Sequence, residues 1–470
     1  MRVSHMDMEG RALRRADWAA RHALARVRHG PYSTDMVSIA DYREKLFDIL
    51  LLMSSWEYRD LAQVATHPMP LRAAQHVKSA EQVPRFNNSQ MDGFVVHPND
   101  PEVVAGKPVP LLPMAAAGHN PVPLTPGFAM PIMTGAKIPD WNGAAFDDDE
   151  CDLCVVPVEE TVAGFDDLTH VTFTPQATFE SGRFVRYRGS DIDYDEELCA
   201  VGDHLTPARL GSLASVGLTQ IAVFKPLRVL VVSTGDEVCQ PGLRPGAAQI
   251  YDSNTSAAVA ALSAAGAHVV GTLHAPDHPD LLLDAVRSWQ ADDTRRADVV
   301  VSMGGISMGA REVIRLASEL EVQQGVENWY GGAQSPRLPN SGMEFCRLPM
   351  QPGGPQAVGQ LAEVPWVALP GNPVSTLVSI EVLLRTSLFG ARPRNRMNVT
   401  VRTPGGDPLS SPMGKTQMRF ARLDADGSAQ LAWSNSSHLL HRQVEATLLM
   451  IIPEDVTVIE DGDTFEALAL

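Results

Sequence analysis

Two neighbouring carboxylates, Asp236 and Glu237, follow the predicted strand of residues 229–233, whose apolar run stops at Ser-Thr-Gly. A continuous apolar run of this kind predicts a strand buried on both faces of a sheet. In open parallel sheets, ligands bind outside the carboxyl ends of the strands, which is where these two acids stand. They are therefore candidates for binding chemistry. The alternative for either acid is that it caps the following turn.

Two further strand exits carry residues suited to an anion. After the predicted strand 298–302 comes Gly-Gly-Ile-Ser-Met-Gly, whose glycines let backbone N–H groups approach a phosphate just before a helix. After the predicted strand 366–369 comes Pro-Gly-Asn-Pro-Val-Ser, a loop made rigid by two prolines. The hydroxyls of Ser302 and Ser307 add further donors. In both places a purely structural turn is the alternative.

All three exits belong to a repeated pattern of strand, turn and helix between about residues 226 and 390. This pattern predicts a parallel sheet covered by helices on both faces. Because helical crossovers join parallel strands, the three exits should meet at one edge and line one crevice. Acids beside a phosphate repel it unless a cation lies between them, and Mg²⁺ bound by few carboxylates plus phosphate oxygens fits this need.

The remaining chain has a different texture. Residues 35–66 are predicted to be helical, with Ser38 as the N-cap. Residues 67–180 are dense in Pro and Gly, with short apolar runs that indicate short strands, and residues 393–470 return to that pattern.

Composition excludes several classes of protein. The formal net charge of -18 and the pI near 5.2 argue against binding nucleic acid or an anionic membrane surface. We expect no signal peptide and no membrane span. Five cysteines without a regular framework predict a reduced, cytoplasmic compartment. Cys151 and Cys154 form a CxxC without a second pair, so an incidental pairing is favoured over a zinc site.

Several of these segments, in this order, resemble one known family. "STGDE", "IYDSN" (250–254), "DVVVSMGGISMG" and "LPGNPVS" resemble the molybdopterin-binding domain of molybdopterin molybdenumtransferases, the MoeA and gephyrin E-domain family. "NNSQMDGFVV" (87–96), "IMTGAKIP" (132–139) and "VRYRGSDI" (185–192) resemble further segments of that family. The resemblance covers about residues 80–390, and the combination is far more specific than any single piece.

The resemblance implies a homodimer of four-part chains that inserts molybdate into adenylylated molybdopterin, releasing AMP, with Mg²⁺. The implied fold is multidomain α/β plus β: a central three-layer α/β/α parallel-sheet domain, a β-rich inserted domain and a small C-terminal β-barrel-like domain. The predicted limits are a basic arm at 1–34, a discontinuous dimerisation and linker domain at 35–66 and 180–225, the inserted domain at 67–179, the α/β domain at 226–392 and the C-terminal domain at 393–470.

The resemblance also implies roles for individual residues. The implied catalytic residues are Asp92, Thr134, Asp191, Glu237 and Glu312, of which the first three would reach the crevice across the dimer. The implied metal ligands are Asp236, Glu237 and Asp277. The spacing between Asp277 and the preceding strand differs from that in the family. The residues predicted to bind the pterin substrate are Ser233, Thr234, Gly235, Gly304, Gly305, Ser307, Gly309, Arg347, Pro370, Gly371, Asn372, Pro373 and Ser375.

The chain departs from the family pattern at several positions. Arg311 and Glu312 stand where the family has an acid and Asp-Tyr, Gly354 stands where a lysine is common, Gln351 stands where some members carry lysine, and "SNSSHLLH" (434–441) replaces a Gly-rich stretch. Two alternatives remain. One is a molybdopterin adenylyltransferase, from a family that shares the α/β domain; the other, left open by the substitutions at Arg311, Glu312 and Gly354, is a weakly catalytic scaffold that binds molybdopterin. Further implied partners are the adenylyltransferase and molybdoenzyme apoproteins.

Overall fold

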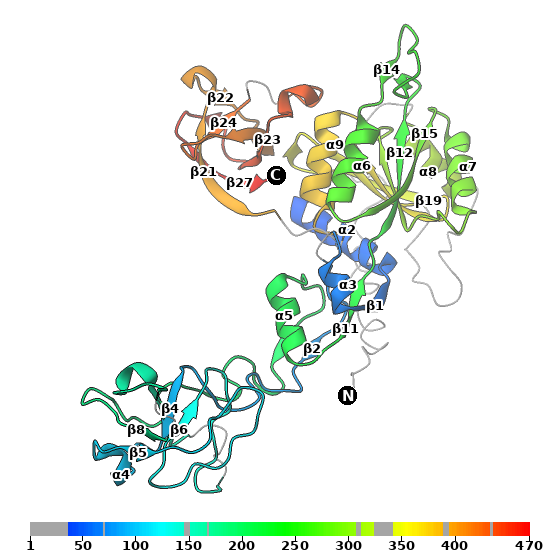
Figure 1. Cartoon of the computed structure of the whole chain (residues 1–470). Helices are drawn as coiled ribbons and strands as arrows, with labels where there is room; N and C mark the ends of the chain where they lie inside the picture. Colours follow the sequence, from blue (N-terminus) through cyan, green and yellow to red (C-terminus); the bar gives the residue numbers. More distant parts are fainter. Residues whose placement is uncertain are drawn as a thin grey trace. The chain divides into compact units, whose positions relative to one another are not determined.

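The computed structural model describes residues 36–68, 71–144, 151–166, 169–306, 312–323, 342–388, 394–432 and 436–470. They form two compact units (Figure 1), the first within Met1–Ala74, Gly202–Leu205 and Ala222–Leu470 and the second within Gln75–Val201 and Thr206–Ile221. The predicted basic arm lies outside the described residues, and the five predicted domain limits stay predictions.

A six-stranded sheet forms the centre of the first unit. Its strands, in sheet order, are β15 (His268–Ala275), β12 (Arg228–Thr234), β16 (Val299–Met303), β20 (Val364–Leu369), β19 (Pro355–Leu361) and β17 (Gly342–Arg347). The first four run parallel, as predicted, but β19 runs antiparallel to both of its neighbours, β20 and β17, so the sheet is mixed. The reason is the turn at Ala362 and Glu363, both at positive φ, because a two-residue turn can join only antiparallel strands.

Helices cover both faces of this sheet. The α6 helix (Asn254–Ala264) and the α9 helix (Pro373–Ser379) pack together on one face, whereas α7 (Pro279–Gln290) and α8 (Val313–Gln323) pack together on the other (Figure 1). The apolar side chains of α7 and α8 are buried against the sheet, and each such side chain contributes about 1.5–3 kcal/mol. This burial holds the strand exits at one edge.

The predicted helix of residues 35–66 is shorter than expected. The α2 helix spans Ile39–Met53, and Ser38 is its N-cap as predicted, because its Oγ accepts from the Asp41 N–H at 3.0 Å. It ends where Ser54 N–H and Oγ both donate to the Leu51 carbonyl. The next two elements are β1 (Trp56–Asp60), which pairs with β11 (Gln220–Phe224), and the short α3 (Leu61–Ala65).

The second unit is built from short strands, as its Pro- and Gly-rich sequence predicted. A three-stranded sheet orders β6 (Met130–Ile132), β4 (Gly93–Val96) and β7 (Cys154–Pro157). The other elements are β2 (Val77–Lys78), β3 (Asn88–Ser89), α4 (Pro101–Val104), β5 (Val109–Pro110), β8 (His170–Val171), β9 (Val185–Arg186), β10 (Glu197–Cys199) and α5 (Pro207–Ser215). Burial raises the pKa of the Cys151 and Cys154 thiols to about 11 and 12, so both behave as inert apolar side chains.

The C-terminal residues form a closed five-stranded barrel, which confirms the predicted barrel-like domain. Its strands, in order, are β23 (Thr416–Leu423), β24 (Ala429–Leu431), β21 (Arg396–Arg402), β27 (Thr464–Ala469) and β25 (Leu448–Ile452), and β25 pairs back to β23. β22 (Leu409–Ser410) pairs with β26 (Val458–Ile459) beside it. The two-residue strand β18 (Met350–Gln351) runs parallel to β23 and joins the barrel to the α/β segment.

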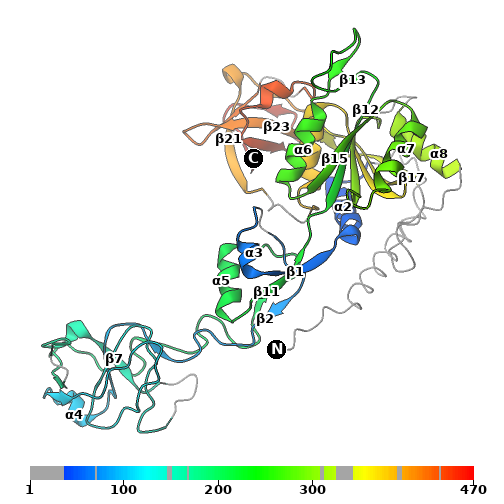
Figure 2. The same ribbon diagram turned by 45° about the vertical axis from the view of Figure 1, so that its right-hand side comes forward.

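Two short strands, β13 (Val238–Cys239) and β14 (Ile250–Tyr251), form an arm beyond the end of β12, visible in Figures 1 and 2. No helix among the described residues combines the length and apolar content needed to cross a membrane.

Candidate functional site

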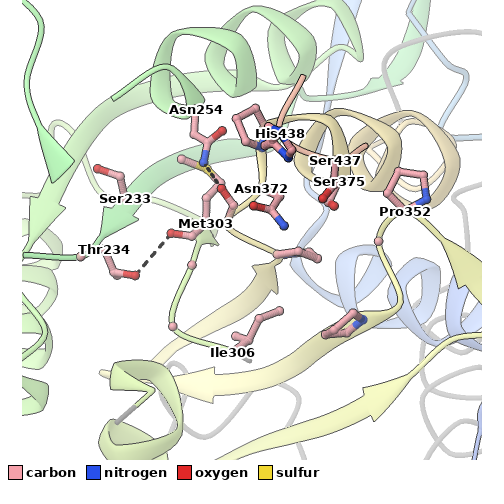
Figure 3. Close-up of a pocket in the computed structure, with 18 of the residues that line it drawn as sticks. Ser233, Thr234, Asn254, Met303, Ile306, Pro352, Asn372, Ser375, Ser437 and His438 are labelled. Carbon is pink, nitrogen blue, oxygen red and sulfur yellow. Dashed lines mark hydrogen bonds between the residues drawn. The ribbon is translucent and has the colours of Figure 1, made fainter. Parts of the chain in front are cut away.

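A cavity of about 1300 Å³ lies at the carboxyl ends of β12, β16 and β20 and reaches the C-terminal barrel (Figure 3). The three predicted strand exits therefore meet. The sequence-predicted residues in its lining are Ser233, Thr234, Gly235, Glu237, Asp277, Gly304, Gly305, Glu312, Arg347, Pro370, Gly371, Asn372, Pro373 and Ser375. Ser307, Gly309 and Arg311 lie outside the described residues.

The strand exits are packed closely against each other and against nearby side chains, and glycine makes this packing possible. Gly235 has φ +132°, and a Cβ there would lie 2.4 Å from Glu237 Oε2. A Cβ on Gly304 would lie 2.9 Å from Thr234 Oγ1, and one on Gly371 would lie 3.2 Å from the Gly304 Cα. The three turns thus hold each other at van der Waals distance and leave their free backbone groups at the cavity edge.

Carboxylates gather at this end of the cavity. Asp236 and Asp277 bond reciprocally: the Asp277 N–H donates to Asp236 Oδ1 at 3.2 Å, and the Asp236 N–H donates to Asp277 Oδ2 at 3.5 Å. Burial, and then the charges of Glu237, Asp236 and Glu312, raise the pKa of Asp277. Asp236 itself stands beside the lining.

These acids alone do not make a metal cage. Within the part of the chain that the structure describes, no three His, Cys, Asp or Glu side chains lie close enough together to hold a metal ion. Burial, and next the negative charges around it, raise the pKa of Asp277, so a bound cation would offset the cost of its charge. The donor set therefore suits a hard cation that completes its coordination with oxygens of a bound ligand and water.

The Pro-Gly-Asn-Pro loop is fixed by hydrogen bonds from three directions. Thr376 Oγ1 donates to the Pro370 carbonyl at 2.8 Å, and Asn254 Nδ2 donates to the Gly371 carbonyl at 2.6 Å. The Val374 N–H at the start of α9 donates to the Ser437 carbonyl at 3.0 Å. This last bond attaches a barrel loop to the helix and brings Ser437 beside Ser375, as Figure 3 shows.

One residue suggested by the sequence faces away from the cavity. Ser302 has no exposed surface, and its Oγ accepts from the Trp366 indole N–H at 2.8 Å. Ser302 is on the strand itself, where alternate side chains face opposite sides, so its hydroxyl serves the buried tryptophan and does not reach a ligand.

Sequence reasoning missed the wall made by the barrel and by the segment before β19. The additional lining residues with polar side chains include Asp252, Asn254, Gln351, Lys415, Ser436, Ser437 and His438. Lys415 and Ser437 lie 40 or more residues beyond the last recognised motif, in short strands and turns without a periodic signal. The only signal in the sequence for the barrel part of this wall was the segment 434–441, where the chain departs from the family pattern.

Three predicted catalytic residues lie in the second unit. Asp92 and Thr134 are brought together: the Thr134 N–H and Oγ1 both donate to Asp92 Oδ1, at 2.6 and 2.9 Å. These bonds lower the pKa of Asp92. Asp191 is exposed, and its N–H donates to the Val83 carbonyl at 2.9 Å.

The comparisons with known proteins agree with this architecture. The family model "MoeA N-terminal region (domain I and II)" matches residues 38–217, and the model "Probable molybdopterin binding domain" matches residues 230–389. Molybdopterin molybdenumtransferase 2 of Mycobacterium tuberculosis is 36% identical over 394 residues, which cover 81% of this chain and 87% of the relative. The molybdopterin molybdenumtransferase of Synechococcus elongatus is 28% identical, covering 87% of this chain and 97% of the relative.

A solved structure of a molybdopterin biosynthesis MoeA protein from Pyrococcus horikoshii matches with a TM-score of 0.67 at 15% identity, over 93% of this chain and 100% of that one. At that identity the likeness is one of fold. Taken with the two family models and the Mycobacterium relative, it leads to one conclusion: this chain belongs to the MoeA family of molybdopterin molybdenumtransferases.

Proposed function

We propose that this chain works in molybdenum cofactor biosynthesis as a molybdopterin molybdenumtransferase, inserting molybdate into adenylylated molybdopterin with release of AMP. The observation that carries the proposal is the single cavity with two different ends. Glu237, Asp277 and Glu312 line it at the strand exits, and Lys415 lines it from the barrel. One ligand can therefore place a nucleotide phosphate near the acids while an oxyanion binds near the cation.

The acidic end fits Mg²⁺, which would neutralise the charge of the adenylate phosphate when bound. Glu237 is positioned for this by Gly235, whose missing Cβ leaves room for the carboxylate. Asp277 also lines this end, and it is a further candidate ligand for the cation.

The other end orients the oxyanion. The dithiolate sulfurs of the pterin replace oxygens of molybdate, so the protein needs hydrogen-bond donors here and no metal-binding side chains. Ser375 is 4% exposed and lies at the start of α9, and Lys415 supplies a positive charge. The rigid loop at Pro370 keeps these donors from moving with the ligand.

We further propose that the molecule acts as a homodimer in which Asp92, Thr134 and Asp191 complete the partner's crevice. The Asp92 carboxylate and the Thr134 hydroxyl are already arranged as one donor-acceptor group. The adenylyltransferase and molybdoenzyme apoproteins are the implied partners before and after this step.

A second candidate function is a scaffold that binds molybdopterin with little turnover. It is favoured by Gln351 and Gly354, which remove two cations from the lining. An adenylyltransferase is less favoured, because the match to the MoeA N-terminal region adds 180 residues that the α/β domain alone would not need.

The test is molybdate-dependent release of AMP from adenylylated molybdopterin by the purified chain, with complementation of a molybdenumtransferase-deficient strain read by nitrate reductase activity. We expect both, and we expect Glu237→Gln to require more Mg²⁺ for the same rate. AMP release that ignores molybdate would point to hydrolysis alone. Binding of the substrate without AMP release would establish the scaffold.

A further inference from the structure

A buried arginine stands behind the cavity wall without a carboxylate partner. Arg419 on β23 is only 4% exposed. Its guanidinium donates to Gln417 Oε1 at 3.2 Å and to the Ala432 carbonyl at 3.0 Å, and among the described residues no acid pairs with it. Burial lowers the pKa of Arg419, but a guanidinium stays charged in a protein. A buried charge of this kind is costly unless something compensates it.

The side chains next to Arg419 form a relay that ends in the cavity. Gln417 is 4% exposed, and its Nε2 donates to Gln351 Oε1 at 3.4 Å. Gln351 is exposed and lines the cavity. The β18–β23 pairing aligns the two amides, because Gln351 lies opposite Gln417 in the parallel register.

The direction of this relay is fixed by chemistry. A guanidinium can only donate, so Gln417 must present its carbonyl oxygen to Arg419 and turn its NH₂ group toward Gln351. Gln351 must then present its own carbonyl oxygen to Gln417, which leaves its NH₂ group for the cavity. Each amide polarises the next, so a chain that starts at a cation ends in stronger donors.

We propose that Arg419 is a positioning residue for the oxyanion substrate: through Gln417 it turns the Gln351 amide into an anion donor and supplies the missing positive charge. This inference rests on the proposed function and deepens it. The ligand class is a tetrahedral oxyanion, either free or as a nucleotide phosphate. Lys415, which precedes β23 in the same wall, acts on the same ligand.

The relay accounts for a neutral residue at position 351. Gln351 stands where some members of the family that the chain resembles carry lysine. A lysine in place of Gln351 would put its ammonium near Arg419, and the two charges would repel. The chain instead keeps one charge, buried and fixed, and presents it through neutral amides that lose little side-chain freedom when the anion binds.

The experiment measures binding of molybdate, and separately of AMP, to the full-length protein by calorimetry. We expect Arg419→Met to weaken binding of either molybdate or AMP by about tenfold, because the electrostatic attraction between the buried guanidinium and the bound anion is lost. The anion whose binding weakens shows whether the relay acts on a free oxyanion or on a nucleotide phosphate. In turnover, KM for that anion should rise while kcat changes little.

Two further variants separate a charge effect from a structural one. Gln351→Lys in the Arg419→Met background should restore binding, because it returns one charge to the wall, and a loosened barrel would not be rescued this way. Gln351→Met removes the terminal donor at an exposed position, so it keeps the test open if Arg419→Met fails to fold. The matched control is Arg422→Met, on the same strand, whose guanidinium is exposed and paired with Asp424.

Unchanged binding of both anions in folded Arg419→Met and in Gln351→Met would overturn the proposal. Failure of the Gln351→Lys rescue would also overturn it. Neither result depends on turnover, because binding is measured directly. A chain that binds molybdate through the relay yet releases no AMP would refute the proposed function and leave this inference standing.

Discussion

Glu321 is predicted to hold together three elements of the α/β segment. Its side chain on α8 has no exposed surface and accepts from Arg287 Nη2 of α7 at 2.7 Å. It also accepts from the Ala362 N–H at 3.1 and 3.3 Å, in the turn that makes β19 antiparallel to β20. Removing the carboxylate leaves a buried N–H unsatisfied and breaks one charged hydrogen bond.

The cost follows from these two losses. A charged hydrogen bond is worth about 1.5–3 kcal/mol, and an orphaned buried donor costs about 1–3 kcal/mol, so Glu321→Ala should lower the free energy of unfolding by about 3–5 kcal/mol. The matched control is Asp284→Ala, which removes an exposed partner of the same Arg287, at 3.6 Å. It should cost less than about 1 kcal/mol.

The measurement is urea unfolding followed by the near-ultraviolet signal of the aromatic side chains, which include the buried Trp366. Glu321→Ala should shift the midpoint with an unchanged slope. A cost no larger than that of Asp284→Ala would refute the reasoning that this carboxylate fixes the turn.

The same carboxyl predicts a dependence on pH. Burial is the largest cause of the raised pKa of Glu321, ahead of the lowering effects of Ala362 N–H and Arg287. Because the folded pKa lies above the ordinary value of 4.5, the part of the stability that is linked to protonation of Glu321 is fully present below that value and is lost as pH rises through the folded pKa. Relative to Glu321→Gln, the wild-type protein should therefore lose stability as pH rises above 4.5. A constant difference would contradict the raised pKa.

Three more predictions concern the turns and the site. Glu363→Gly should stabilise the fold by about 0.5 kcal/mol, because residue 363 has φ +61°, and a lower thermal midpoint would contradict this. Gly235→Ala should reduce AMP release at ordinary Mg²⁺, because its Cβ would displace the Glu237 carboxylate, and it should also lower the thermal midpoint, because residue 235 has φ +132°; a normal Mg²⁺ titration by the folded variant would remove that carboxylate from the site. Asp92→Asn and Glu237→Gln should each be inactive alone at ordinary Mg²⁺, but subunit exchange between them should restore up to half the wild-type activity per mixed dimer. A monomer by light scattering, or no recovery, would place the whole site within one chain.

The sequence predicted the strand exits well, because each joins a continuous apolar run to a turn rich in Gly or Pro, and such signals are local. It predicted the parallel strands β12, β16 and β20 for the same reason. It failed for the direction of β19, where Gln356 and Gln360 interrupt the apolar pattern although both are buried. The sequence also predicted a helix that continues beyond the end of α2. The β-prone residues after Ser55 are too few to outweigh the helical pattern of the residues before them.

The barrel wall of the cavity could not be predicted in the same way. Gln351, Lys415 and His438 carry no spacing in common, and they meet only because β18 pairs with β23 and Ser437 bonds the start of α9. Those are long-range contacts between short segments. Their pattern in the sequence is indistinguishable from that of an ordinary solvated turn.

The pairing of β18 with β23 has a consequence for how the chain is made. The segment that contains Gln351 leaves the ribosome before β23, and protein synthesis supplies residues at about 5–20 per second. For several seconds the sheet and its acidic strand exits can exist while Gln351 has no strand beside it, because Gln417 and Arg419 have not yet been made. During translation the nascent chain therefore has the acidic end of the cavity before it has the barrel wall. A truncation before residue 416 should preserve this state and make it available for measurement.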